Sequence, residues 1–144
     1  MPRFFDLPAA EGLLPEVERL LKSLIRSKQE YDQSEAELGL INQRITLAGG
    51  MVPPHDRIVA LHGRKDSAAR GLKSTVENIQ ATGCQIKDIE TGLVDFPTLY
   101  KDQEVYLCWK LGETGIAFWH HVTDGFRGRH AIDSEFLANH RGEA

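Results

Sequence analysis

The sequence predicts an α+β fold, in which a long antiparallel two-helix hairpin is followed by a small antiparallel sheet of three or four strands. Two observations predict it. Apolar residues recur at helical spacing before Gly83, whereas after it they alternate or form short runs between turn residues. With 144 residues we expect one domain, comprising the hairpin over 1–83, the sheet over 84–122, and a loop and short C-terminal helix over 123–144.

The first helix is predicted from its end signals and a heptad repeat. Asp6 suits the cap of a short first turn, and Pro15 suits the first position of a long helix, where its missing N–H has no partner. Apolar a and d positions then recur from Val17 to Ala48, with two serines in the middle, and Gly49-Gly50 ends the helix.

The second helix is expected to begin near Asp56, which can cap it, and to stop at Gly83. Its apolar seam, from Ile58 to Ile79, is thinner than that of the first helix. Because the first helix carries more seam than the second can cover, we expect a homodimer. The charged residues of both helices are expected to face solvent.

Four strands are expected after Gly83, at 84–89, 92–100, 103–111 and 115–122. Pro97 has no N–H to donate, so its strand must lie at a sheet edge or be interrupted there.

The turns set the strand register. If residues 101–102 form a two-residue turn, Asp95 lies directly opposite Cys108. If residues 113–114 form another, Cys108 lies opposite Trp119. A slip of one residue in either turn would exchange the two faces of a strand.

In this register Asp95, Cys108 and His121 share a mixed face with Trp119. His120 lies on the opposite, apolar face, which we expect to pack on the helices, because adjacent strand residues point to opposite faces.

Composition excludes several classes of protein. The net charge is −4, and the basic residues are spread along the chain, so nucleic-acid binding is not expected. No apolar run is long enough to span a membrane, and the N-terminus lacks a signal-peptide pattern. Two cysteines provide no disulfide framework, so we expect a cytoplasmic protein.

Four residues are candidates for catalysis: Asp95, Cys108, Glu113 and His120. Asp95 is either a general base or metal ligand, or a solvent-facing strand carboxylate. Cys108 is either a nucleophile or thiolate ligand, or a small buried apolar residue, and a neighbouring Asp95 would raise its pKa. Glu113 is either a ligand or a turn residue that favours solubility.

A metal site is the alternative that these residues leave open. His120 with Glu113 and Asp95 are the candidate ligands, and the loop at 124–129 could bring His130 back to them. The chain has no zinc-type spacing such as CxxC or HExxH, so we expect no required cofactor, with Zn²⁺ or Mn²⁺ as the possible divalent metals.

Three further residues are candidates for ligand binding. Arg127 and Arg129 could clamp a small anionic ligand, or could pair with local carboxylates. Trp119 could anchor a contact, or belong to the core.

The segments GLVDFP (92–97), LCWKLGE (107–113), WHH (119–121) and GFRGR (125–129) carry a family resemblance. The chain resembles an uncharacterised prokaryotic family, domain of unknown function 2203. The residues that match the family motifs are Gly92, Leu93, Asp95, Phe96, Pro97, Cys108, Trp109, Gly112, Glu113, Trp119, His120, Gly125 and Arg129.

Since His121 and Arg127 fall outside those motifs, the resemblance favours His120 and Arg129 as site residues. It implies a small stand-alone bacterial protein, and it implies no particular reaction.

We therefore expect a homodimeric module that binds a partner or small ligand through the 92–132 region. The alternative is a small metal-dependent hydrolase with an Asp/Glu/His site and an arginine anion clamp. Anion binding by Arg127 and Arg129 without turnover is a third reading.

Overall fold

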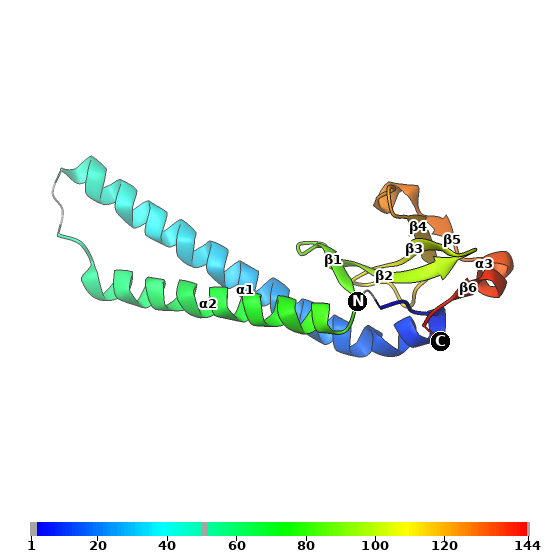
Figure 1. Cartoon of the computed structure of the whole chain (residues 1–144). Helices are drawn as coiled ribbons and strands as arrows, with labels where there is room; N and C mark the ends of the chain where they lie inside the picture. Colours follow the sequence, from blue (N-terminus) through cyan, green and yellow to red (C-terminus); the bar gives the residue numbers. More distant parts are fainter. Residues whose placement is uncertain (1–2, 50–51, 144) are drawn as a thin grey trace. The chain divides into compact units, whose positions relative to one another are not determined.

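The computed structural model describes residues 3–49 and 52–143 and confirms the α+β fold. Two long helices are followed by an antiparallel sheet (Figure 1). The chain divides into two compact units. One contains the chain up to Lys22 together with everything from Val76 onward, and the other contains Ser23–Thr75. The single-domain expectation stays a prediction.

Helix α1 is one continuous element, Leu7–Ala48. The Asp6 side chain caps it by accepting a hydrogen bond from the Ala9 amide at 2.8 Å. Pro15 lies inside this helix rather than at the start of a second one, so the predicted break is wrong. The buried residues Ala10 and Val17 anchor the helix on either side of the exposed proline, which explains why it continues.

Helix α2, His55–Ala81, begins one residue before the predicted cap, so Asp56 lies in its first turn. In the unit formed by Ser23–Thr75 the two helices pack through buried Leu24, Leu61 and Ala68. A Cβ atom at Gly71 would lie 2.9 Å from the Ser27 hydroxyl, so this glycine allows the close approach of the helices. Gly50 of the predicted stop signal lies outside the described residues.

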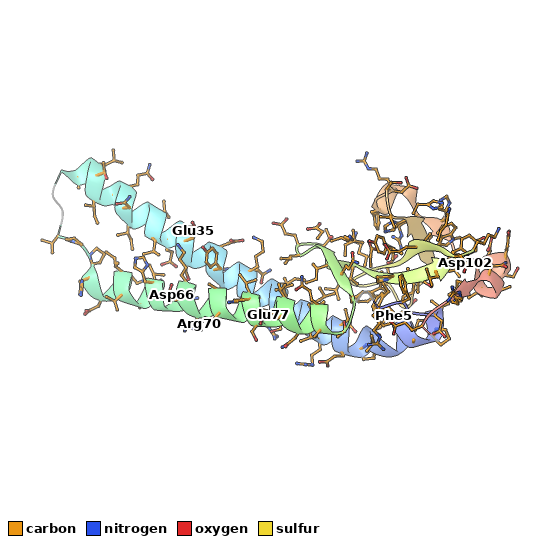
Figure 2. All side chains as sticks on the ribbon, in the orientation of Figure 1. Phe5, Glu35, Asp66, Arg70, Glu77 and Asp102 are labelled. Carbon is orange, nitrogen blue, oxygen red and sulfur yellow. The ribbon has the colours of Figure 1, made fainter. Side chains whose placement is uncertain are left out.

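Charged side chains cover the outer surface of α2. Asp66, Arg70 and Glu77 are exposed and project from the helix (Figure 2). This is the solvated exterior that the helical pattern predicts.

The sheet contains the four expected strands and two short ones from the tail. The strands are β1 (Gln85–Asp88), β2 (Leu93–Tyr100), β3 (Gln103–Lys110), β4 (Phe118–His121), β5 (His130–Ala131) and β6 (His140–Arg141). They pair in the order β1-β2-β3-β4-β5, and β6 pairs with β2. The tail also forms the 3₁₀ turn η1, Phe126–Gly128, and helix α3, Ser134–Asn139.

Pro97 lies on β2 between the residues that pair with β1 and those that pair with β6. Its carbonyl accepts a hydrogen bond from the Phe5 amide at 2.7 Å, and it has no N–H to leave unpaired. On this side the pairing of β2 is interrupted where the sequence predicts an edge or a break, while on the other side Pro97 pairs with Tyr106 of β3.

The first predicted register is confirmed. Lys101 and Asp102 have φ angles of 52° and 65°, typical of a two-residue hairpin turn, and Asp95 pairs with Cys108.

The second predicted register is wrong by one residue. Cys108 pairs with Phe118 rather than Trp119, and Tyr106 pairs with His120 rather than His121. The connection spans 111–117 instead of forming a two-residue turn. This shift moves His120 to the face of Asp95 and Cys108, and moves Trp119 to the opposite face.

The face opposite Asp95 forms the core of this unit. Its fully buried residues include Val94, Phe96 and Leu107, and the Phe5 ring packs edge-on against Phe96 at 5.4 Å between centroids. The first turns of α1 and the η1 turn lie on opposite sides of the sheet (Figure 1). The Asp95 face therefore lies under the loop that carries η1.

Candidate functional site

The centre of the candidate site is a buried pair formed by Asp95 and His120. Asp95 lies on β2 and His120 on β4, so the pair spans the intervening strand β3. The His120 Nε2 atom is 3.0 Å from each carboxylate oxygen of Asp95. The side chains of Asp95 and His120 are only 1% and 5% exposed.

The proton on His120 follows from its partners. Its Nδ1 donates to the His121 carbonyl at 2.8 Å, because a carbonyl can only accept, while Nε2 faces the Asp95 carboxylate. Burial by itself would lower the pKa of His120. The hydrogen bonds to Asp95, Cys108 and the His121 carbonyl, with the charge of Asp95, outweigh burial and raise that pKa to about 10. His120 is therefore an imidazolium at neutral pH.

Cys108 completes the cluster from the strand between the two partners. Single donor atoms of Asp95, Cys108 and His120 all lie within 4.8 Å of one another, and the thiol is fully buried. Burial raises the pKa of Cys108, and the charge of Asp95 raises it further, against the opposing effects of His120 and Arg129.

This arrangement does not activate Cys108 as a nucleophile. A neighbouring imidazolium can activate a thiol by lowering its pKa, but here burial and the charge of Asp95 outweigh that effect, so the pKa of Cys108 is raised and the thiol stays protonated. The structure thus brings three candidates together as a neutral thiol beside an ion pair.

The fourth catalytic candidate, Glu113, makes separate contacts. Its Oε2 accepts from Arg129 Nη2 at 2.7 Å, and its Oε1 accepts from the Lys110 amide at 2.7 Å. The backbone carbonyl of Glu113 also accepts from the Trp109 indole at 3.1 Å. These bonds close the 111–117 connection, so Glu113 shapes the loop beside the cluster.

Arg129 lies over the same face. Its guanidinium stacks on Phe118 at 3.9 Å and on Phe126 at 4.5 Å, as well as pairing with Glu113. Its Nε is buried and has no hydrogen-bond partner among the described residues. Phe118, which pairs with Cys108, lies directly beneath this arginine.

The other two ligand-binding candidates lie elsewhere. Arg127 is exposed on η1. Trp119 lies on the opposite face of β4 from His120. Its ring stacks on that of Phe136, with 4.9 Å between centroids, and lies 5.1 Å from the ring centroid of Tyr100. Trp119 therefore belongs to an aromatic cluster that includes Phe136 of α3.

A second group of potential ligands was not predicted as a set. His121, Asp124 and His130 each place a donor atom within 4.8 Å of the others, and all three are exposed. The sequence offered a partial signal, since the 124–129 loop was expected to bring His130 back towards β4. The missing information was the register of β3 and β4, which decides that His121 rather than His120 lies beside His130.

The fold and the site define a class: an α+β protein with a helical hairpin and an antiparallel sheet that carries a buried carboxylate–imidazole–thiol cluster. A family model described as an uncharacterised conserved protein, DUF2203, matches residues 3–132. The chain belongs to this family, which confirms the resemblance of its motifs. Searches of curated proteins and of solved structures return no significant match.

Within the described ranges, no helix is long and apolar enough to cross a bilayer.

Proposed function

We propose that this chain is a small-ligand-binding module whose ligand is a divalent transition-metal ion, held by Asp95, Cys108 and His120. One observation carries the proposal: a carboxylate oxygen, a thiol sulfur and an imidazole nitrogen lie within 4.8 Å of one another. These are the donor types that zinc prefers in proteins.

The spacing of Asp95 and His120 fits a tetrahedral ion after a small adjustment. Ligand atoms of such a zinc site lie roughly 3.3–3.6 Å apart, given bond lengths of about 2.0–2.3 Å. The 3.0 Å separation between His120 Nε2 and Asp95 needs to open by a few tenths of an ångström. The fourth position would be left to water.

The orientation of His120 supports the same role. A metal-binding histidine usually donates its second ring N–H to a carbonyl or carboxylate, which fixes the ring. His120 Nδ1 makes such a bond to the His121 carbonyl, and Nε2 faces the Asp95 carboxylate.

Two observations favour binding without turnover over hydrolysis. The side chains of Asp95 and His120 are at most 5% exposed and Cys108 is fully buried, which leaves no surface for a substrate to reach. Glu113, which the hydrolase alternative needs as a ligand or base, is bonded to Arg129 and to the Lys110 amide. Arg129 is the other partner of this ion pair, so the guanidinium that an anion clamp would use is already paired with Glu113.

Cobalt titration tests the metal proposal, because Co²⁺ bound to a thiolate gives a charge-transfer band. We expect one such Co²⁺ per chain, lost in Cys108→Ser and retained in Cys84→Ser. Cys84 is the matched control, since it is buried but lies outside the cluster. Absence of the band in the parent chain, or its survival in Cys108→Ser, contradicts the proposal.

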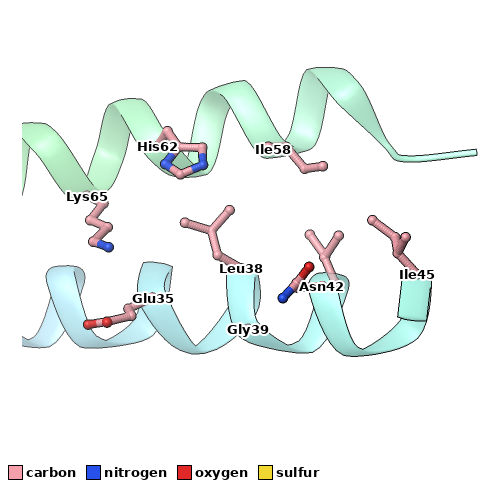
Figure 3. Close-up of a pocket in the computed structure, with 9 residues that line it drawn as sticks. Glu35, Leu38, Gly39, Asn42, Ile45, Ile58, His62 and Lys65 are labelled. Carbon is pink, nitrogen blue, oxygen red and sulfur yellow. The ribbon is translucent and has the colours of Figure 1, made fainter. Parts of the chain in front are cut away.

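We also propose self-association through the hairpin unit. The C-terminal part of α1 and the N-terminal part of α2, here called the far half of the hairpin, enclose an opening of about 400 Å³. Its apolar lining residues Leu38, Ile41, Ile45 and Ile58 are all half-buried (Figure 3). Leu47 is 79% exposed. A monomer rarely leaves such an apolar seam uncovered.

A second copy of the chain suits this opening. Glu35 lines its α1 side and Lys65 its α2 side, so a two-fold related copy would place acid against base while burying both seams (Figure 3). Light scattering after gel filtration should give a dimer that Ile45→Glu converts to a monomer, with Gln43→Glu, at an exposed position outside the lining, as control. A monomeric parent chain at micromolar concentration contradicts this second proposal.

A further inference from the structure

We propose that His121, Asp124 and His130 form a second, surface metal site, separate from the buried cluster. Two imidazoles and a carboxylate place one donor atom each within 4.8 Å of the others, and all three residues are exposed. Two histidines with one carboxylate bind first-row divalent ions and leave the remaining coordination positions open.

The backbone holds the three residues in place. Trp119 pairs with His130 across β4 and β5, which sets His130 beside the end of β4. The Asp124 amide donates to the His121 carbonyl at 3.0 Å, closing the turn that follows β4. The turn thus returns Asp124 towards His121.

Gly128 allows this turn to close. A Cβ atom there would lie 2.7 Å from the Asp124 Cβ, closer than real Cβ atoms approach. A side chain at residue 128 would therefore push Asp124 out of the turn and away from the two imidazoles.

Trp119 lies against both imidazoles. Its ring centroid is 5.0 Å from that of His121 and 4.8 Å from that of His130, and the two imidazoles are 5.8 Å apart. Contact with a fixed indole restricts the imidazole rotamers, so less conformational freedom is lost when a metal binds.

The two sites differ in chemistry and in access. His120 and His121 are consecutive, but they point to opposite faces of β4, and the His121 carbonyl accepts from both His120 Nδ1 and the Asp124 amide. The surface site has no thiol and is open to solvent, so it should take a borderline ion, with Cu²⁺ bound more tightly than Ni²⁺ or Zn²⁺.

Trp119 fluorescence reports on this site, because bound Cu²⁺ quenches a neighbouring indole and Zn²⁺ does not. The titration uses Cys108→Ser, so that the buried cluster contributes no thiolate. We expect saturable quenching by Cu²⁺ with a 1:1 stoichiometry, reversed by excess Zn²⁺.

Adding His130→Gln or Asp124→Asn should weaken Cu²⁺ binding at least tenfold, whereas His55→Gln, at an exposed position on α2, should not change it. Asp124→Asn keeps the size of the side chain and the turn, and a melting temperature within 2 °C of the parent (roughly 1 kcal/mol or less) confirms folding. Equal affinity in all three variants, or no saturable quenching, overturns the inference. Neither result depends on the cobalt band of the buried cluster, so the two metal proposals fail independently.

Discussion

At the scale of single residues, the charge on His120 is the feature with the widest consequences. A buried imidazolium exists here because Asp95 lies 3.0 Å from its Nε2 and a main-chain carbonyl receives its Nδ1 proton. The same two contacts that stabilise the proton also prepare the ring for a metal ion. In the proposed site the proton and the metal compete for Nε2.

Alkaline pH should destabilise the metal-free protein. The folded pKa of His120 is raised to about 10 from its ordinary 6.5. The protonated ring therefore contributes stability that is complete below pH 6.5 and is lost as pH rises through 10. Between pH 6.5 and 8.5 we expect the free energy of unfolding to fall by about 2 kcal/mol.

Urea unfolding in the presence of a chelator measures this change. His120→Gln should give a flatter profile over the same window, which ends below the ordinary pKa of the two thiols. A parent chain whose stability is constant from pH 6.5 to 8.5 would show that His120 is not protonated in the folded state.

At the scale of elements, the connection between β3 and β4 decides which histidine enters the cluster. A two-residue turn would have put His121 opposite Tyr106 and left His120 on the other face. The Glu113 carboxylate instead bonds the Lys110 amide, and the Trp109 indole bonds the Glu113 carbonyl, which holds a longer connection.

Glu113→Ala should destabilise the protein by about 1–3 kcal/mol, because it leaves the Lys110 amide and the Arg129 guanidinium without their acceptor. Chemical denaturation compares it with Glu104→Ala, an exposed change on β3 that should cost less than about 0.5 kcal/mol. Equal effects of the two substitutions would mean that the carboxylate does not hold the connection.

Substitution of Pro15 tests whether α1 is continuous through this residue. Pro15→Ala should stabilise the protein by about 1 kcal/mol or more, since an interior proline removes a helical hydrogen bond and crowds the preceding turn. Thermal unfolding provides the measurement. Pro8→Ala is the control, because Pro8 is in the first turn, where its N–H would have no helical partner, and it should give no gain.

At the scale of the whole molecule, the two compact units differ in how completely they bury their apolar residues. Val94, Phe96 and Leu107 of the sheet are inaccessible to solvent, whereas Ile41 and Ile45 of the hairpin are only half-buried. The far half of the hairpin therefore has fewer contacts to resist local opening.

Hydrogen exchange should reveal this difference. Amides at 38–48 are expected to exchange faster than those at 20–24 in dilute protein, and to slow as concentration rises if the hairpin associates with a second copy. Uniform protection along α1 at low concentration would contradict the predicted weakness of its far half.

The sequence by itself determined the order of the two long helices and the first four strands, because helical spacing, alternation and turn residues are local signals. It also determined the first strand register, since Lys101-Asp102 forms a two-residue turn and pairs Asp95 with Cys108. Pro97 likewise marked the stretch of β2 where neither β1 nor β6 pairs with it, although the β3 side stays paired.

Only the tertiary structure decided which face each histidine occupies. The length of the second connection depends on side-chain hydrogen bonds of Trp109 and Glu113, which no local pattern encodes. One residue of register exchanges every side chain of a strand between the faces. That exchange brought His120 to Asp95 and Cys108, and left His121 to meet Asp124 and His130 on the opposite face.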